Sequence, residues 1–147
     1  WNDFESINKL SSKLKTPLAM SDQSGFLFEE FSNYLNNGYP QLLRGTSKKF
    51  GITGLKQLCS LAENFKKHCE IGTGGNIFMN MANIHVMMTI TNCDFYEYWM
   101  PTWAHDFACS EEIELDNNSE IVAPSKSGIG LTLDEDWIKS HKIATLK

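Results

Sequence analysis

The feature that most limits the fold of this sequence is the near-constant spacing of its short strand patterns. Strand-like segments end at four positions, Asp22, Thr46, Gly72 and Glu97, which are separated by 24, 26 and 25 residues. Amphipathic helical patterns fill most of each interval. A repeating unit of one strand and one helix predicts a mainly parallel sheet covered by helices. So regular a period favours a (β/α)8 barrel, in which each unit adds one strand to the wall.

A doubly wound sheet shows the same alternation, but it usually carries a glycine fingerprint after its first strand. No GxGxxG occurs in this sequence, so we favour the barrel. The strands are expected at residues 16–20, 41–44, 68–73 and 94–98, and the helices at 3–14, 26–35, from 51, 77–90 and from 134. A polar hairpin is expected to join residues 112–116 to 120–123.

Four strands cannot close an eight-stranded barrel, which typically takes about 250 residues. We therefore predict an α/β fold that forms the C-terminal half of a (β/α)8 TIM barrel, with about four parallel strands and covering helices, over residues 1–110. Residues 111–147 are expected to form a C-terminal hairpin, loop and short helix that pack on a capping domain absent from this chain. Either the chain belongs to a longer polypeptide or another chain completes the barrel. The sequence leaves both open.

The composition narrows the class of partner and the compartment. The formal net charge is -5 and the lysines form no basic stripe, which argues against a nucleic acid partner. No apolar run reaches the roughly 18 residues that span a bilayer. The four cysteines show neither a CxxC pair nor metal-ligand spacing, which is typical of reduced structural thiols. We expect a cytoplasmic protein.

Residues just past the carboxyl ends of barrel strands converge on one site. Two of the four expected strand ends carry acids, Asp22 and Glu97. A loop acid of this kind is often simply hydrated. Glu97, however, lies between Tyr96 and Tyr98, where a carboxylate needs a partner or a function. At Gly72, by contrast, a strand ends without any side chain that could move a proton.

Seven short motifs extend these observations from the fold to a family. In chain order they are Thr16-Pro17-Leu18-Ala19-Met20-Ser21-Asp22, Phe50-Gly51-Ile52-Thr53-Gly54, Leu61-Ala62-Glu63, Thr73-Gly74-Gly75-Asn76, Ala82-Asn83-Ile84-His85, Asn92-Cys93-Asp94-Phe95-Tyr96-Glu97 and Ser127-Gly128-Ile129-Gly130. Together they resemble the C-terminal part of the mandelate racemase / muconate lactonizing enzyme group of the enolase superfamily. The resemblance runs from about Phe4 to Leu133.

The resemblance implies a Mg²⁺-dependent enzyme that removes a proton from the carbon next to a substrate carboxylate. Racemases, cycloisomerases and acid-sugar dehydratases of this type hold the ion with three carboxylates on successive strands, and the ion stabilises the enolate. The base is a lysine on an early strand or a His-Asp dyad on later strands. The implied substrate is a small carboxylate such as an acid sugar or hydroxy acid. The implied partner is a further copy in a homo-oligomer or the remainder of a longer chain.

Carried over position by position, the resemblance places the third metal ligand at Asp22 and the substrate-side catalytic carboxyl group at Glu97. The dyad aspartate falls near Thr46 and the dyad histidine on Gly72, so neither dyad residue is retained. The first two metal ligands and the early lysine are expected upstream of Trp1. We therefore expect this chain alone to be inactive. The alternative is a non-catalytic relative that keeps the barrel and a small-anion pocket.

The turn after the third strand is the remaining candidate site. Thr73, Gly74 and Asn76, together with Thr46, are candidate substrate-binding residues, because backbone N–H groups at a helix start can face an anion. A bare turn is an equally good reading of the same residues. Among the histidines, His85 is expected to pack under the barrel wall and His68 to lie at the end of the barrel away from catalysis.

Overall fold

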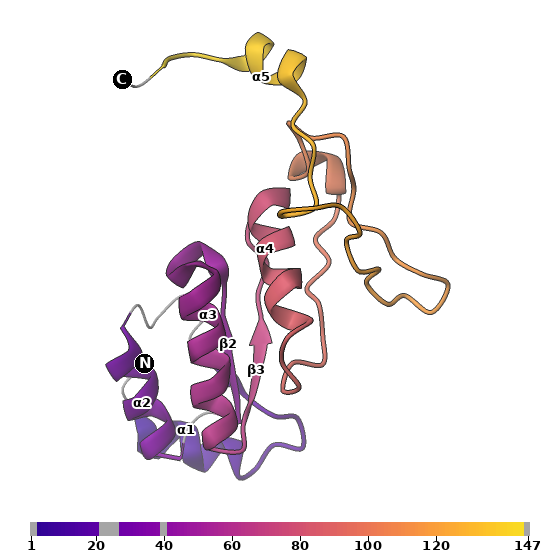
Figure 1. Ribbon diagram of the computed structural model, residues 1–147. Coiled ribbons are helices and arrows are strands. Elements are labelled where there is room, and N and C mark those ends of the chain that lie inside the picture. The colour runs from indigo at the N-terminus through magenta and orange to yellow at the C-terminus, as the bar shows by residue number, and fades with distance from the viewer. Residues whose placement is uncertain (1–2, 21–26, 39–40, 146–147) are drawn as a thin grey trace.

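The computed structural model describes residues 3–20, 27–38 and 41–145 and contains a parallel sheet covered by helices (Figure 1). The sheet order is β1-β2-β3. Its strands are β1 (Ala19–Met20), β2 (Leu42–Gly45) and β3 (His68–Ile71). The helices are α1 (Phe4–Ser11), α2 (Phe28–Asn36), α3 (Ser47–Asn64), α4 (Ile77–Met87) and α5 (Glu135–His141), with a 3₁₀ turn, η1 (Thr102–Ala104). The predicted mixed α/β class with a parallel sheet is confirmed.

The two faces of the sheet have different chemistry, and the register shows why. Leu43 pairs with Cys69, and Arg44 pairs with Glu70. Leu43 and Cys69 are fully buried in the main apolar core, which also contains residues of α2 and α3. Because successive strand side chains point to opposite faces, Arg44 and Glu70 share the face away from that core. The sheet therefore has one apolar, helix-covered face and one face that carries charged groups.

Helix α3 begins earlier than its sequence pattern indicates. Thr46 caps it, and its hydroxyl accepts a hydrogen bond from the Lys48 N–H at 3.4 Å. The predicted start, Gly51, lies inside the element with φ of 64°, a left-handed conformation that favours glycine. A first turn capped by Thr46 therefore precedes the long amphipathic helix that the pattern marks.

The predicted fourth strand, residues 94–98, is wrong: no strand is assigned there among the described residues. The segment does lie beside β3, where the Cys69 N–H donates to the Asn92 carbonyl at 2.8 Å. Further along the same segment, the amides of Asp94 and Phe95 donate to the carboxylate of Glu70, at 3.2 and 3.1 Å. The Glu70 side chain thus accepts the N–H groups that would otherwise pair with the backbone of β3, so the strand pairing does not continue here.

Beyond the segment beside β3, the chain extends away from the sheet and leads to α5 (Figure 1). The predicted hairpin is reduced to one antiparallel bridge, Leu115 with Ile121, beside the hydrogen bond from the Val122 N–H to the Glu114 carbonyl. Ile113 packs with residues of α4 in a second apolar cluster, which anchors the segment. The domain division at residue 110 stays a prediction.

Candidate functional site at the strand ends

The carboxyl ends of β2 and β3 lie side by side. The Gly72 N–H donates to the Gly45 carbonyl at 2.9 Å, which continues the ladder by one bond past β3. Thr46 starts α3, and Asn76 starts α4 by accepting a hydrogen bond from the Met79 N–H at 3.0 Å. Both helices therefore begin next to the strand ends, as the predicted strand–helix period requires.

Asn83 joins these two strand ends from within α4. Its side chain is fully buried. The amide oxygen accepts from the Ser47 N–H at 2.8 Å, while the amide nitrogen donates to the Gly72 carbonyl at 2.9 Å and to the Thr46 hydroxyl at 3.3 Å. Sequence reasoning missed this residue, although an amide among the apolar residues of this helix was a signal, because a buried amide needs partners.

The turn from Thr73 to Asn76 is held by the protein itself. Asn80, buried in α4, accepts from the Gly74 N–H at 2.6 Å and from the Thr73 hydroxyl at 3.1 Å. The same hydroxyl accepts from the Gly75 N–H at 3.3 Å. A Cβ at Gly74 would lie 2.3 Å from the Met79 Cβ, so glycine is required by close packing. In this conformation the amides of Thr73, Gly74 and Gly75 have protein acceptors, which agrees with the bare-turn reading.

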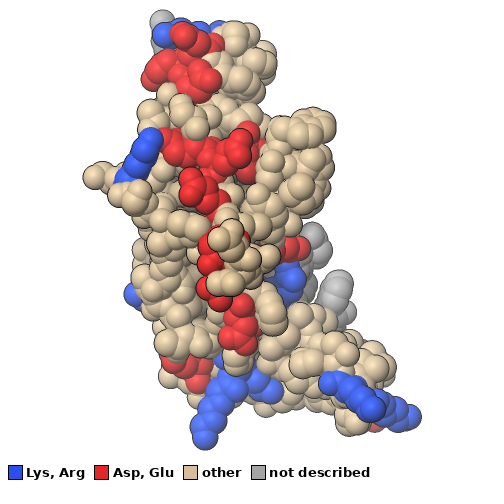
Figure 2. Space-filling model, turned by 90° about the vertical axis from the view of Figure 1, so that its right-hand side faces the viewer, with Lys and Arg blue, Asp and Glu red and all other residues tan. Residues whose placement is uncertain are grey.

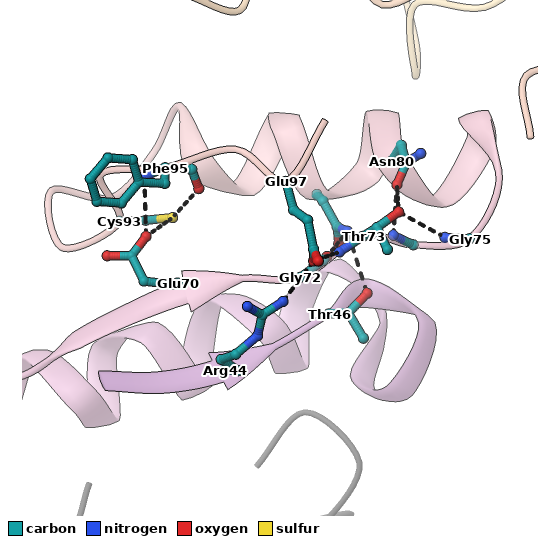
Figure 3. Close-up of polar contacts among 12 residues, drawn as sticks. Arg44, Thr46, Glu70, Gly72, Thr73, Gly75, Asn80, Cys93, Phe95 and Glu97 are labelled. Carbon is teal, nitrogen blue, oxygen red and sulfur yellow. Dashed lines mark hydrogen bonds and ion pairs between the residues drawn. The ribbon is translucent and has the colours of Figure 1, made fainter. Parts of the chain in front are cut away.

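Glu97 reaches the same place from the segment beside β3 (Figure 3). Its Oε2 atom lies 2.6 Å from Nη2 of Arg44 and accepts from the Thr73 N–H at 2.8 Å. The Arg44 and Glu97 side chains are 25% and 47% exposed. The contact is a charge-assisted hydrogen bond, but solvent screening keeps its net stabilisation within about 1 kcal/mol. Arg44 was also missed from sequence, because its partner is 53 residues away.

Three of the four predicted strand-end positions thus come together. Thr46 and Gly72 share Asn83, and Glu97 binds the N–H of Thr73, the next residue after Gly72. Thr46 is only 3% exposed, and its hydroxyl accepts a hydrogen bond from Asn83. Asp22, the predicted metal ligand, lies outside the described residues. The roles assigned to Thr46, Thr73, Gly74, Asn76, Glu97 and Asp22 stay predictions.

The described residues do not by themselves form a Mg²⁺ site at the strand ends. Mg²⁺ prefers oxygen ligands, usually carboxylates with water. In the described part of the chain the strand ends bring one carboxylate, that of Glu97, and Arg44 already balances its charge. The one cluster of potential metal ligands found among the described residues contains His68, at the amino end of β3.

The described histidines are engaged away from the strand ends. His85 is half-buried, and its Nε2 atom lies 3.2 Å from the Ile129 carbonyl, so it ties α4 to the C-terminal segment. His105 stacks on Trp99 with ring centroids 3.7 Å apart. His141 stacks on Trp137 within α5. None of these contacts places an imidazole beside Glu97.

A cleft of about 610 Å³ lies between α4 and the C-terminal segment. Its rim carries an ion pair between Glu111 and Lys126. The Thr132 N–H also donates to Glu111, and together with Lys126 it lowers the pKa of that carboxyl from 4.5 to about 2. We place the candidate site at the strand ends and not in this cleft, because barrels of the predicted kind carry their functional residues at the carboxyl ends of the strands.

Parallel strands with a helix after each one define a protein of the α/β class with a parallel sheet. The family model described as "Enolase C-terminal domain-like" matches residues 1–137, and the chain belongs to this family. The resemblance inferred from the seven motifs is confirmed at this level. None of the curated protein sequences compared with this chain matches it.

Solved structures agree with the family. A Pseudovibrio sp. protein assigned to the mandelate racemase/muconate lactonizing enzymes is 26% identical, with a TM-score of 0.89 over 97% of this chain. An isomerase from Streptomyces coelicolor A3(2), 23% identical, gives a TM-score of 0.77 over 93%. A mandelate racemase/muconate lactonizing enzyme from Sulfitobacter sp., 21% identical, gives 0.75 over 98%. The chain spans 38%, 38% and 36% of these three structures.

Proposed function

We propose that this chain is the C-terminal part of the barrel of an enolase-superfamily protein that acts on a small carboxylate, by removing the proton next to the carboxylate. A racemase, a cycloisomerase and an acid-sugar dehydratase all fit this proposal. The observation that carries it is the position of Glu97, whose carboxylate sits beside the converging ends of β2 and β3. In barrels of this class, that is where substrates bind.

Each described residue of the site has a definite part in this proposal. Glu97 is the catalytic carboxyl group that faces the substrate carboxylate. Arg44 holds Glu97 and supplies a positive charge that a substrate anion could share when the pair opens. Thr73, Gly74 and Asn76 shape the turn below, and Thr46 completes the strand-end wall through its contact with Asn83.

The base and the complete metal site belong, in this proposal, to residues outside the described part of the chain. Mg²⁺ is the family's cofactor, and when bound it would stabilise the negative charge that develops on the substrate. The described strand-end residues do not form its site, and Asp22 is the proposed ligand from this chain. We therefore propose that the 147-residue chain alone has no appreciable turnover.

A second candidate function is a non-catalytic relative that keeps the barrel and a small-anion pocket. The Arg44–Glu97 pair favours it, because the guanidinium of Arg44 already engages the carboxylate at 2.6 Å. The buried Thr46 hydroxyl and the side-chain-free Gly72 point the same way. A stability test with Mg²⁺ separates the two, since a bound ion stabilises the folded state.

The proposed partner is a small carboxylate molecule. Acidic side chains form a band along one face of the molecule, whereas the Lys and Arg side chains in that view lie mostly toward one end (Figure 2). That pattern supports our expectation of no nucleic acid partner. No helix in the described part of the chain is long and apolar enough to cross a bilayer. We also propose a cytoplasmic location. The proposed protein partner is either a further copy in a homo-oligomer or the remainder of a longer chain.

The binding half of the proposal is tested by titrating the chain with mandelate, a hydroxy acid used as a probe, while following the amide resonances of Thr73 and Gly74. We expect these resonances to shift. We expect Glu97→Gln to bind the probe about tenfold more tightly, because it removes a like charge and releases Arg44. Glu120→Gln, which makes the same charge change on the exposed hairpin, should leave the affinity unchanged. Shifts absent from the turn would exclude a carboxylate site there.

The catalytic half is tested by following exchange of the mandelate α-proton in D2O with Mg²⁺ present. The 147-residue chain is expected to give the background rate, and exchange above it would contradict the proposed inactivity of this chain. Thermal unfolding with and without millimolar Mg²⁺ completes the test. A rise in Tm that Asp22→Asn abolishes favours the enzyme lineage, and an unchanged Tm favours the non-catalytic relative.

A further inference from the structure

Three side chains of different kinds converge at the amino end of β3, away from the candidate site. They are His68, Glu70 and Asp94, and one ligand atom from each lies within 4.8 Å of the other two. The Nδ1 atom of His68 lies 3.2 Å from Oδ2 of Asp94 and 3.6 Å from Oε1 of Glu70. The strand rise of roughly 3.3 Å per residue puts His68 about 13 Å, and Glu70 about 7 Å, before Gly72 along the strand. The cluster is therefore distinct from the contacts of Glu97 at the strand end.

The carboxylate of Glu70 is fixed in place by the backbone. The side chain is 12% exposed, and its Oε2 atom accepts from the Asp94 and Phe95 N–H groups at 3.2 and 3.1 Å. Figure 3 shows Glu70 beside Cys93 and Phe95, apart from the group that Glu97 forms with Arg44 and Thr73. The other oxygen, Oε1, lies 3.6 Å from Nδ1 of His68 and has only a longer contact with the backbone, 3.5 Å from the Asp94 nitrogen. Carboxylates that bind metals are usually oriented in this way, by hydrogen bonds from the surrounding protein.

The cluster also carries more negative charge than it balances. Two carboxylates approach one imidazole nitrogen, which can donate a single hydrogen bond. Neither Glu70 nor Asp94 has a lysine or arginine ion-pair partner among the described residues. The Asp94 and His68 side chains are 57% and 43% exposed, so a small cation can reach them from solvent.

We propose that His68, Glu70 and Asp94 bind a divalent transition metal of the zinc class. Tetrahedral ligands at roughly 2.0–2.2 Å from such an ion lie about 3.4 Å from one another, between the two observed separations. An imidazole nitrogen favours Zn²⁺ or Co²⁺ over Mg²⁺, whose ligands are oxygens. The ligands are His68 Nδ1, Glu70 Oε1 and Asp94 Oδ2, with water in the fourth position. The proposal is independent of the function proposed for the strand ends.

The test is a calorimetric titration of the untagged, chelator-treated chain with zinc chloride, in buffer that contains millimolar Mg²⁺ to occupy oxygen-only sites. We expect one Zn²⁺ per chain. His68→Gln and Asp94→Asn should each weaken binding by at least about tenfold, because each removes a ligand. His105→Gln and Asp136→Asn are the matched controls, since they remove an imidazole and an exposed carboxylate elsewhere. Circular dichroism of each variant checks that it folds.

A second readout keeps the test independent of variant stability. Co²⁺ in place of Zn²⁺ should give a visible absorption band typical of tetrahedral coordination, and His68→Gln should remove it while His105→Gln keeps it. Zn²⁺ affinity equal in the wild type and His68→Gln would overturn the proposal. So would loss of binding in Asp22→Asn, because the ion would then sit at the strand ends. The absence of any stoichiometric binding would overturn it as well.

Discussion

Replacing Asn83 by alanine removes the buried amide that joins the ends of β2 and β3. The substitution deletes three hydrogen bonds and leaves the Ser47 N–H and the Gly72 carbonyl buried without that partner. Each orphaned group costs about 1–3 kcal/mol of desolvation. The Thr46 hydroxyl still accepts from the Lys48 N–H at 3.4 Å, so we assign no cost to its lost bond with Asn83. We expect a loss of about 3 to 4 kcal/mol, a large share of the about 5–15 kcal/mol typical of a domain.

The measurement is urea unfolding followed by circular dichroism, with the free energy of unfolding extrapolated to water. Asn118→Ala is the control, because Asn118 is exposed on the turn of the C-terminal segment and its backbone N–H, which donates to Asp116 at 2.8 Å, is kept. We expect its unfolding free energy to change by less than about 0.5 kcal/mol. If Asn83→Ala costs no more than this control, the amide does not hold the strand ends together and the reasoning fails.

Three further predictions concern other parts of the chain. Gly74→Ala should destabilise the fold by about 1–3 kcal/mol in the same assay, because the new Cβ meets Met79 at 2.3 Å, and an unchanged midpoint would refute the close packing. Glu111 has a pKa lowered from 4.5 to about 2, mainly by Lys126, so its stabilisation is present above pH 4.5 and is lost as the pH falls toward 2. Glu111→Gln should therefore lose less stability than the wild type over that range. Burial raises the pKa of Cys93 to about 12, so its alkylation at pH 8 should be slow until denaturant is added, and fast labelling of the folded chain would contradict this.

The strand–helix period predicted the order and type of the elements up to α4, because the alternation of buried and exposed side chains is a local property. It failed at residues 94–98. Those residues have the aromatic, alternating pattern of a strand, yet the backbone amides of Asp94 and Phe95 bind the carboxylate of Glu70. A side chain from 24 or 25 residues earlier decides this, and no local propensity reports it.

At the site, too, local patterns predicted some residues and missed those whose contacts are distant in sequence. The spacing rule brought Thr46 and Gly72 together, because successive strand ends must meet at one edge of a parallel sheet. Glu97 joins them from a segment that lies beside β3 without forming a strand. The spacing rule could not identify Arg44 or Asn83. The partners of these two residues are 11 to 53 residues away and depend on which side chains face each other across elements. Of the two, only Asn83 could have been noticed from sequence, as an amide within an apolar helix.

The carboxylates near the carboxyl end of β3 and those near His68 differ in whether a basic side chain balances their charge. This difference decides where a cation should bind. At the carboxyl end, the one described carboxylate, Glu97, has a guanidinium partner at 2.6 Å, so a cation there would have to compete with Arg44. At the amino end, Glu70 and Asp94 share the single Nδ1 atom of His68. Desolvation penalises an unbalanced carboxylate most where it is least exposed, and Glu70 is 12% exposed. Among the described residues, the stronger demand for a metal ion is therefore at the amino end, opposite the end where barrels of this class carry out their chemistry.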